Sequence, residues 1–131
     1  MNMSEYLCKA VLNEVLRNTN YTPPSTVYLA LYTSNPTAAD TGTEVSGGGY
    51  ARQAVTFAAP TVVNGKQTVR NNAEVVFPVA TADWGLITHA GIRDAATGGN
   101  LLYFAELANP RTILNGDRFR ALVNTISVTQ A

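Results

Sequence analysis

The spacing of hydrophobic and polar positions changes from helical to strand-like after about twenty residues. Apolar side chains recur every three or four positions from Leu7 to Leu16, behind Ser4 as a candidate N-cap. This pattern predicts one amphipathic helix within residues 1–20. Its apolar stripe covers either the protein's own sheet or a neighbouring subunit, and we expect the first, as for most surface helices. Cys8 lies in this stripe and is expected to be a buried core residue.

From residue 26 onward, short apolar or alternating runs separated by turn residues predict β-strands. Thr26–Tyr32 is apolar on both faces, which is typical of a central strand. Asn64-Gly65 is a strong hairpin signal. Pro78 closes one predicted strand, and Asn109-Pro110 is expected to break the chain between two others. The further strands are predicted at Tyr50–Ala58, Lys66–Arg70, Asn72–Val79, Trp84–Arg93, Leu101–Leu107, Arg111–Leu114 and Arg118–Thr129, the last with a bulge near Val123–Thr125.

Short strands at near-regular spacing behind a single helix predict a mainly β fold. We expect a two-layer antiparallel β-sandwich with one N-terminal amphipathic helix, and a small barrel is the alternative. The chain of 131 residues has the size of one domain, 1–131, with the helix in 1–20 and the sandwich in 26–131.

The stretch Asn71–Glu106 holds the only Trp and the only His of the chain. On a period of two, Trp84, Leu86, Ala90 and Ile92 share one face of the predicted strand. The opposite face carries Ile87, His89 and Arg93. Upstream, Arg52 lies on the polar face of the strand that Tyr50 begins. The first face predicts core, and the interface candidates are His89, Arg93, Ile87, Arg52 and Tyr50.

No residue pattern in the chain is typical of an enzyme or of a metal site. One His and one Cys without paired carboxylates do not make a ligand set. Asp83, His89 and a serine can be written as a triad, but no strained strand-to-helix turn exposes a serine nucleophile. The glycines of Ser46–Gly49 are not followed by Gly-Lys-Ser/Thr or by a helix, so they indicate a turn rather than a phosphate loop. We therefore expect no catalytic residues, no metal and no cofactor.

The composition points toward assembly with other proteins. Nine basic and nine acidic residues give a formal net charge of zero, and only 14% of residues are charged. Such a surface lacks the basic patch of a nucleic-acid-binding protein, and it does little to keep copies of the chain apart. No apolar run reaches the length of a membrane span. Self-association or docking onto a larger body is the expectation.

The amino-acid sequences of three segments resemble those of a known protein family. The segments Thr43–Gln53 (TEVSGGGYARQ), Phe77–Gly85 (FPVATADWG) and Thr88–Leu102 (THAGIRDAATGGNLL) are similar to small virion proteins of tailed bacteriophages labelled tail fibre or minor tail proteins. The resemblance runs from about Leu7 to Val128 and brings no enzymatic residues with it. It implies a virion component made in the bacterial cytoplasm, which associates with its own copies and with other tail or capsid proteins.

Three functions follow from this resemblance and from the composition. The leading prediction is a non-enzymatic, homo-oligomeric subunit of the tail fibre apparatus, acting as a fibre module or as a fibre-tail adaptor. The alternative is a capsid decoration (cement) protein on the phage head. The third is a host glycan-binding module, in which the long loop Thr33–Gly49 and exposed Tyr21, Tyr50 or Tyr103 would meet the sugar.

Overall fold

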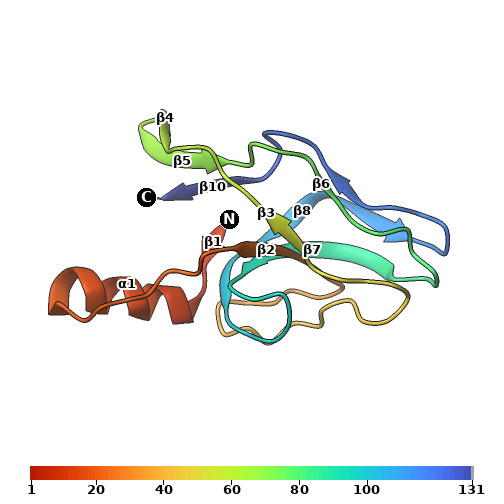
Figure 1. Cartoon of the computed structure of the whole chain (residues 1–131), viewed down its shortest axis with the longest axis horizontal. Helices are drawn as coiled ribbons and strands as arrows, with labels where there is room; N and C mark the ends of the chain where they lie inside the picture. The colour runs from red at the N-terminus through yellow and green to blue at the C-terminus, as the bar shows by residue number, and fades with distance from the viewer. Residues whose placement is uncertain (131) are drawn as a thin grey trace.

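The computed structural model describes residues 1–130 and shows antiparallel β-sheets with one helix near the N-terminus (Figure 1). The largest sheet has five strands in the order β1-β8-β7-β2-β3. The elements are β1 (Asn2–Met3), α1 (Glu5–Arg17), β2 (Val27–Tyr32), β3 (Gln53–Val55), β4 (Thr61–Val63), β5 (Lys66–Arg70), β6 (Val75–Val76), β7 (Gly85–Arg93), β8 (Leu101–Ile113), β9 (Arg120–Ala121) and β10 (Ser127–Gln130).

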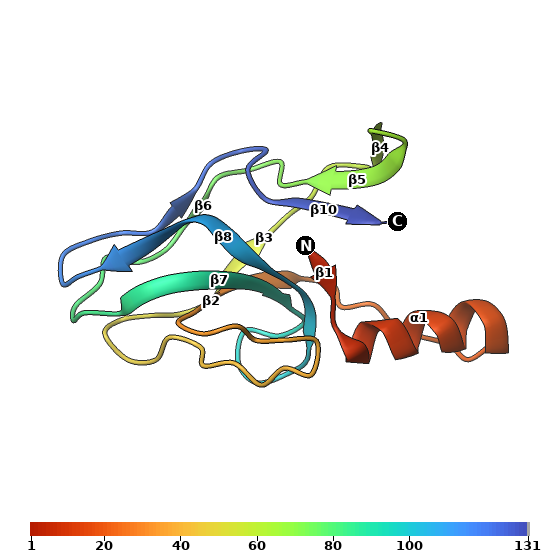
Figure 2. The ribbon, with the colours of Figure 1, turned by 180° about the vertical axis from the view of Figure 1, so that it is seen from behind.

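Two smaller sheets lie over the five-stranded sheet and form the second layer (Figures 1 and 2). One has the order β10-β5-β4, and the other is the pair β6-β9. Between the layers, Trp84 packs edge-on against Tyr50 and Phe77, and Phe77 packs edge-on against Phe119. Ring contacts of this kind stabilise a core beyond the area that they bury. The predicted two-layer antiparallel β-sandwich with one helix is therefore confirmed.

The glycine run before β3 is shaped by the aromatic core. Gly48 has a positive φ of 59°, and a Cβ atom there would lie 3.0 Å from the Trp84 ring. Its carbonyl accepts hydrogen bonds from Trp84 Nε1 at 2.8 Å and from the Thr81 amide at 2.9 Å. The glycines of Ser46–Gly49 thus form a turn that closes onto Trp84. This agrees with the prediction of a turn rather than a phosphate loop.

Several sequence predictions are confirmed at the level of single elements. The helix begins after Ser4, and β2 is a central strand between β7 and β3. Asn64 and Gly65 have φ values of 52° and 76°, as a tight hairpin between β4 and β5 requires. The strands predicted at Tyr50–Ala58 and Asn72–Val79 are shorter than expected, because only β3 and β6 pair within them.

The predicted break at Asn109-Pro110 is wrong, since β8 runs through it as a single strand. Its register with β7 jumps from Glu106 opposite His89 to Arg111 opposite Ile87. The intervening residues of β8 bulge out of the ladder, and a proline in a bulge is not required to donate a ladder hydrogen bond. The same irregularity shifts the phase of β7.

This shift corrects the predicted faces of β7. Ile87 was placed opposite the tryptophan face, but it is fully buried in the core cluster that contains Trp84, Ala90 and Ile92. Leu86 was placed on the core face, but it is half exposed. One irregular step in the ladder reverses the side to which the preceding residues point.

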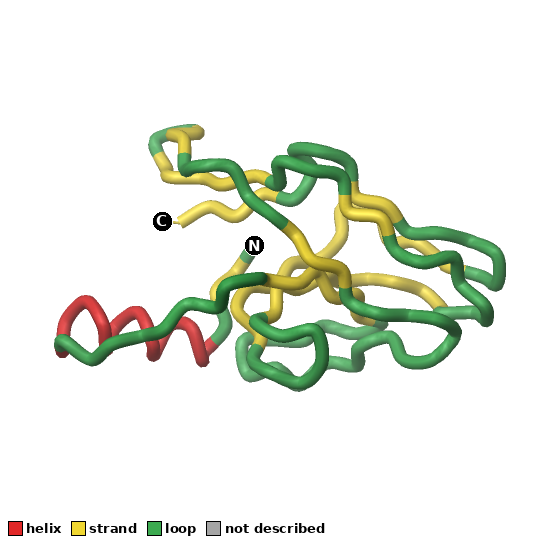
Figure 3. The backbone as a smooth tube through the Cα atoms, in the orientation of Figure 1, coloured by secondary structure: helices red, strands yellow, loops and turns green. Residues whose placement is uncertain are grey.

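The predicted final strand is divided in two. A turn closed by the hydrogen bond from the Thr125 amide to the Leu122 carbonyl separates β9 from β10 (Figure 3). Asn124 takes a left-handed conformation there, with φ of 66°. The predicted bulge is thus a complete turn. It is held by buried Asn71, whose side chain bonds the Leu122 carbonyl and the Ile126 amide.

Candidate assembly surface

The first turn of α1 is firmly attached to the five-stranded sheet. The Ser4 side chain caps the helix by accepting a hydrogen bond from the Leu7 amide at 3.2 Å. The Ser4 amide donates to the Leu102 carbonyl at 2.9 Å, and the Glu5 amide donates to the Ala38 carbonyl at 2.8 Å. Leu7 is buried. The start of the helix is therefore fixed in position by β8 and by the long loop.

Beyond this turn, α1 extends away from both layers and contacts its own return segment (Figures 1 and 2). Tyr6 meets Tyr21 of that segment edge-on, with 6.5 Å between ring centroids. Leu12 is 58% exposed, Val15 71% and Leu16 75%. The prediction that the stripe covers the protein's own sheet is wrong, which leaves the neighbouring subunit as the alternative.

Cys8 belongs to the same exposed stripe. It was predicted as a buried core residue, but its thiol lies on the outer surface of the helix. The spacing that made it look like core is real, because Cys8, Leu12, Val15 and Leu16 do share one helix face. The structure shows that this face has no partner within residues 1–130.

The residue order of α1 is nearly symmetric about the point between Val11 and Leu12, close to the middle of the helix. Counting outward from that point, Val11 matches Leu12, Lys9 matches Glu14 and Leu7 matches Leu16. Cys8 and Val15 occupy another mirrored pair of positions, as do Ala10 and Asn13. Two antiparallel copies of such a helix that pack on the stripe place apolar residues opposite apolar residues, with Cys8 of one copy opposite Val15 of the other. The sequence of α1 therefore has the self-complementarity of a two-fold interface.

The predicted interface residue Arg93 lies inside the chain. Its guanidinium makes two hydrogen bonds to the Asp40 carboxylate, at 2.8 and 2.9 Å, and one to the Tyr32 hydroxyl at 3.0 Å. Burial by itself would lower the pKa of Arg93, but the bonds to Asp40 and Tyr32 raise it above its ordinary value. The charged guanidinium thus anchors the long loop to β2 and β7.

Arg52 and Tyr50 form a second anchor for the same loop. Arg52 bonds both carboxylate oxygens of Glu44 at 2.8 Å, and the Tyr50 hydroxyl donates to Glu44 at 2.6 Å. Burial alone would raise the pKa of Glu44, but these hydrogen bonds hold that pKa below its usual value. Burial and the Glu44 hydrogen bond raise the pKa of Tyr50 well above that of a free tyrosine. Tyr50 is thus partly buried against the core, with its hydroxyl bonded to Glu44.

The remaining interface candidates lie on β7. Ile87 is fully buried, whereas His89 is half-buried, with its Nδ1 2.8 Å from the Thr88 hydroxyl. Asp83 accepts a hydrogen bond from the Asn115 amide, and no bond joins it to His89 among the described residues. Residues 1–130 contain no group of three His, Cys, Asp or Glu residues placed to hold a metal. An interface role for His89 stays a prediction.

The helical spacing predicted the apolar stripe of α1 but not its exposure. Leu12, Val15 and Leu16 were all recognised as one stripe, and the near-symmetry of the helix was the signal that could have marked it as an interface. Helical spacing alone cannot distinguish a stripe that covers a sheet from one that meets a second copy.

Comparison with known protein families identifies the family of this chain. In the described part of the chain, no helix has the length and apolar character needed to cross a membrane. A search of curated proteins found no match. The family described as Podophage GP4 fiber I protein gp80 matches residues 2–129, nearly the whole sequence. This agrees with the tail fibre resemblance, and the chain therefore belongs to this phage tail fibre family, whose members are structural components of the virion.

Proposed function

We propose that the protein is a self-associating subunit of the tail fibre apparatus and that α1 is its self-association surface. The observation that carries this proposal is the exposed stripe of Leu12, Val15 and Leu16 on a helix that projects from the sheets. A helix of 13 residues is close to the length at which isolated helices are marginal in water. Contact with a second copy stabilises the helix and removes the stripe from water.

The near-symmetry of α1 supports an antiparallel, two-fold arrangement. In that arrangement Cys8 of each copy lies opposite Val15 of the other, in the middle of the stripe. A parallel arrangement would instead place Cys8 opposite Cys8 and Val15 opposite Val15. A closed two-fold pair also gives a fibre a defined building unit.

A pair of charged substitutions on α1 tests both the surface and its orientation. Val15→Glu places a charge in the middle of the stripe, so we expect weaker association in sedimentation equilibrium. Val15→Glu combined with Cys8→Lys puts opposite charges face to face only in the antiparallel pair and should recover association. Val62→Glu, at an exposed position of β4, is the control with the same substitution.

Each outcome of this test bears on the proposal. Failure of the double variant to recover association would exclude the antiparallel pairing. A wild-type protein that stays monomeric at high concentration would exclude α1 as a self-association surface. Retained circular dichroism and melting temperature show that the variants are folded.

The fibre module and the adaptor differ from a capsid decoration protein in copy number. The family match favours a fibre component. Quantitative mass spectrometry of purified particles should give a small number of copies relative to the major capsid protein. Copies that track the major capsid protein would instead support decoration of the head.

A further inference from the structure

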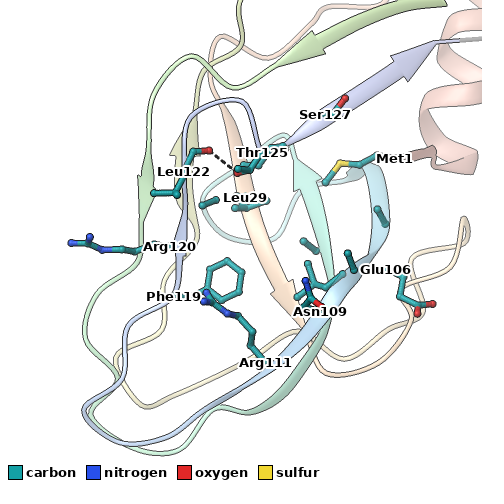
Figure 4. Close-up of a pocket in the computed structure, with 16 residues that line it drawn as sticks. Met1, Leu29, Glu106, Asn109, Arg111, Phe119, Arg120, Leu122, Thr125 and Ser127 are labelled. Carbon is teal, nitrogen blue, oxygen red and sulfur yellow. Dashed lines mark hydrogen bonds between the residues drawn. The ribbon is translucent and has the colours of Figure 1, made fainter. Parts of the chain in front are cut away.

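A largely apolar groove of about 780 Å³ opens between the two layers, away from α1 (Figure 4). One wall is β8 with its bulge, and the other is formed by β9 and the turn that precedes β10. Leu29, Ala90, Phe119 and Ile126 contribute its apolar lining and belong to the core cluster. The groove is therefore a gap in the side of the sandwich.

Both walls present strand edges rather than strand faces. Five consecutive residues of β8, from Ala105 to Asn109, line the groove, as do four consecutive residues from Phe119 to Leu122. Successive side chains of a strand point to opposite faces, so a run of consecutive lining residues means that the backbone itself borders the gap. The groove thus lies between two peptide backbones.

These edges have no strand partner within residues 1–130. On its outer side β8 pairs with β1 only at Tyr103 and Phe104, and β9 pairs only with β6. Unpaired strand edges are the surfaces to which another extended segment adds. A strand entering the groove would bridge the two layers and cover the apolar lining.

The groove is preformed by hydrogen bonds that hold its second wall. The Asn71 side chain donates to the Leu122 carbonyl at 2.9 Å and accepts from the Ile126 amide at 2.8 Å. The Asn71 amide donates to the Ile126 carbonyl at 3.1 Å. Since Asn71 is completely buried, these bonds hold the turn of residues 122–126 against the segment that follows β5.

Arg111 gives the groove a positive charge. Its guanidinium lies over the ring of Phe119, 5.6 Å from the ring centroid, and no acidic side chain pairs with it among the described residues. The other arginine at the border, Arg120, points out of the groove and lies 3.5 Å from Glu74 (Figure 4). Glu106 also points away from the centre of the groove. An occupant that complements this site carries a carboxylate.

We infer that the groove binds an extended, apolar segment of another virion protein, with a carboxylate that pairs with Arg111. A second copy of this chain does not fit the same requirements. Its edge strands β1, β3, β4, β6, β9 and β10 carry no acidic residue. The segment adds to the free edge of β8 by main-chain hydrogen bonds, and its alternate side chains reach the apolar lining.

A fluorescent peptide tests three features separately: the pairing with Arg111, the addition of a strand to β8 and the contact with the apolar lining. The probe is a short, acetylated and amidated peptide that alternates Val and Thr and carries one Glu. We expect it to bind the full-length protein in fluorescence anisotropy and to protect the amides of residues 105–111 from hydrogen exchange. The same peptide with Lys in place of Glu should bind on the order of fivefold more weakly at low salt. N-methylation of its alternate amides should abolish binding.

Variants of the protein locate the binding. Arg111→Glu should weaken the Glu peptide on the order of tenfold and reverse the preference between the two peptides. Arg118→Glu is the matched control, because Arg118 is exposed nearby and does not line the groove. Ala108→Trp fills the groove from the wall of β8 and should block both peptides. Val15→Glu on α1 should leave peptide binding unchanged, which separates this proposal from self-association.

The opposite results would overturn the inference. Equal binding of the Glu and Lys peptides would remove the role of Arg111, and binding of the N-methylated peptide would remove strand addition. An oligomeric state that changes in Arg111→Glu without any peptide would identify a second copy as the occupant and contradict the proposal. Melting temperatures of the variants confirm that each one is folded.

Discussion

The helix α1 and the aromatic cluster around Trp84 are both rich in large apolar side chains, but they meet different environments. Trp84, Phe77 and Phe119 are enclosed between two layers, and the one polar atom of the Trp84 ring bonds the Gly48 carbonyl. Leu12 and Leu16 are more than half exposed. The aromatic cluster is therefore enclosed by its own chain, whereas the apolar stripe of the helix is not.

The body of the protein and α1 also differ in how their charged groups are paired. Arg52 and Arg93 reach into the loop of residues 33–49 and each forms two hydrogen bonds to a carboxylate. Charges on α1 make no ion pair within the described residues. A long loop can thus be rigid, because buried ion pairs and a tryptophan-capped turn hold it, while a regular helix can be the incomplete part of a fold.

Truncating Trp84 is the strongest test of the enclosed aromatic core. Trp84→Ala removes ring contacts with Tyr50 and Phe77 and leaves a cavity, at a cost of about 3–5 kcal/mol in the free energy of unfolding. Urea denaturation measures this loss. Leu86→Ala, on the half-exposed neighbour, is the control and should cost less than about 1 kcal/mol. Equal costs for the two variants would contradict the core assignment.

Removing one charge from the Arg93 anchor should have the next largest effect. Asp40 has a positive φ of 60°, which asparagine tolerates, so Asp40→Asn changes the charge without straining the backbone. We expect a loss of about 1–2 kcal/mol, reduced from that of a fully buried pair because the Asp40 side chain is 35% exposed. Glu74→Gln removes the exposed pair with Arg120 and should cost under about 0.5 kcal/mol.

The Glu44 anchor makes stability depend on pH. The pKa of Glu44 is lower in the folded protein than the ordinary value of 4.5, so its stabilising contribution is complete above that value. As the pH falls below 4.5 and through the lower folded pKa, protonation of Glu44 weakens its bonds to Arg52 and Tyr50, and this contribution is lost. We expect the melting temperature to fall over this window by less in Glu44→Gln than in the wild type. Parallel curves for the two proteins would show that Glu44 does not carry the effect.

Much of the fold could be predicted because its signals are local. The cap at Ser4, the Asn64-Gly65 hairpin and the two apolar faces of β2 each depend on residues close in sequence. The burial of Ile87 could not be predicted in the same way. It follows from the bulge of β8 opposite β7, which is a property of pairing between distant segments.

The candidate sites were less accessible to sequence reasoning for the same reason. Arg93 and Asp40 are 53 residues apart, and their pairing, which buries the predicted interface residue Arg93, has no local signal. The groove beside Arg111 exists because β1 covers only two residues of β8. By contrast, the stripe on α1 was fully visible in the sequence, and only its exposure required the structure.

The smallest effect on the unfolding of the isolated subunit should come from a substitution on the exposed stripe of α1. Leu16→Ser replaces a side chain that is 75% exposed, so the free energy of unfolding of an isolated subunit should change by under about 0.5 kcal/mol. Association adds stability only when copies meet, so the wild-type melting temperature should rise with protein concentration. In Leu16→Ser it should stay constant and equal the wild-type value at high dilution. If the wild type also showed no dependence on concentration, the exposed stripe would have to be covered by a different virion protein, because self-association would then contribute nothing to its stability.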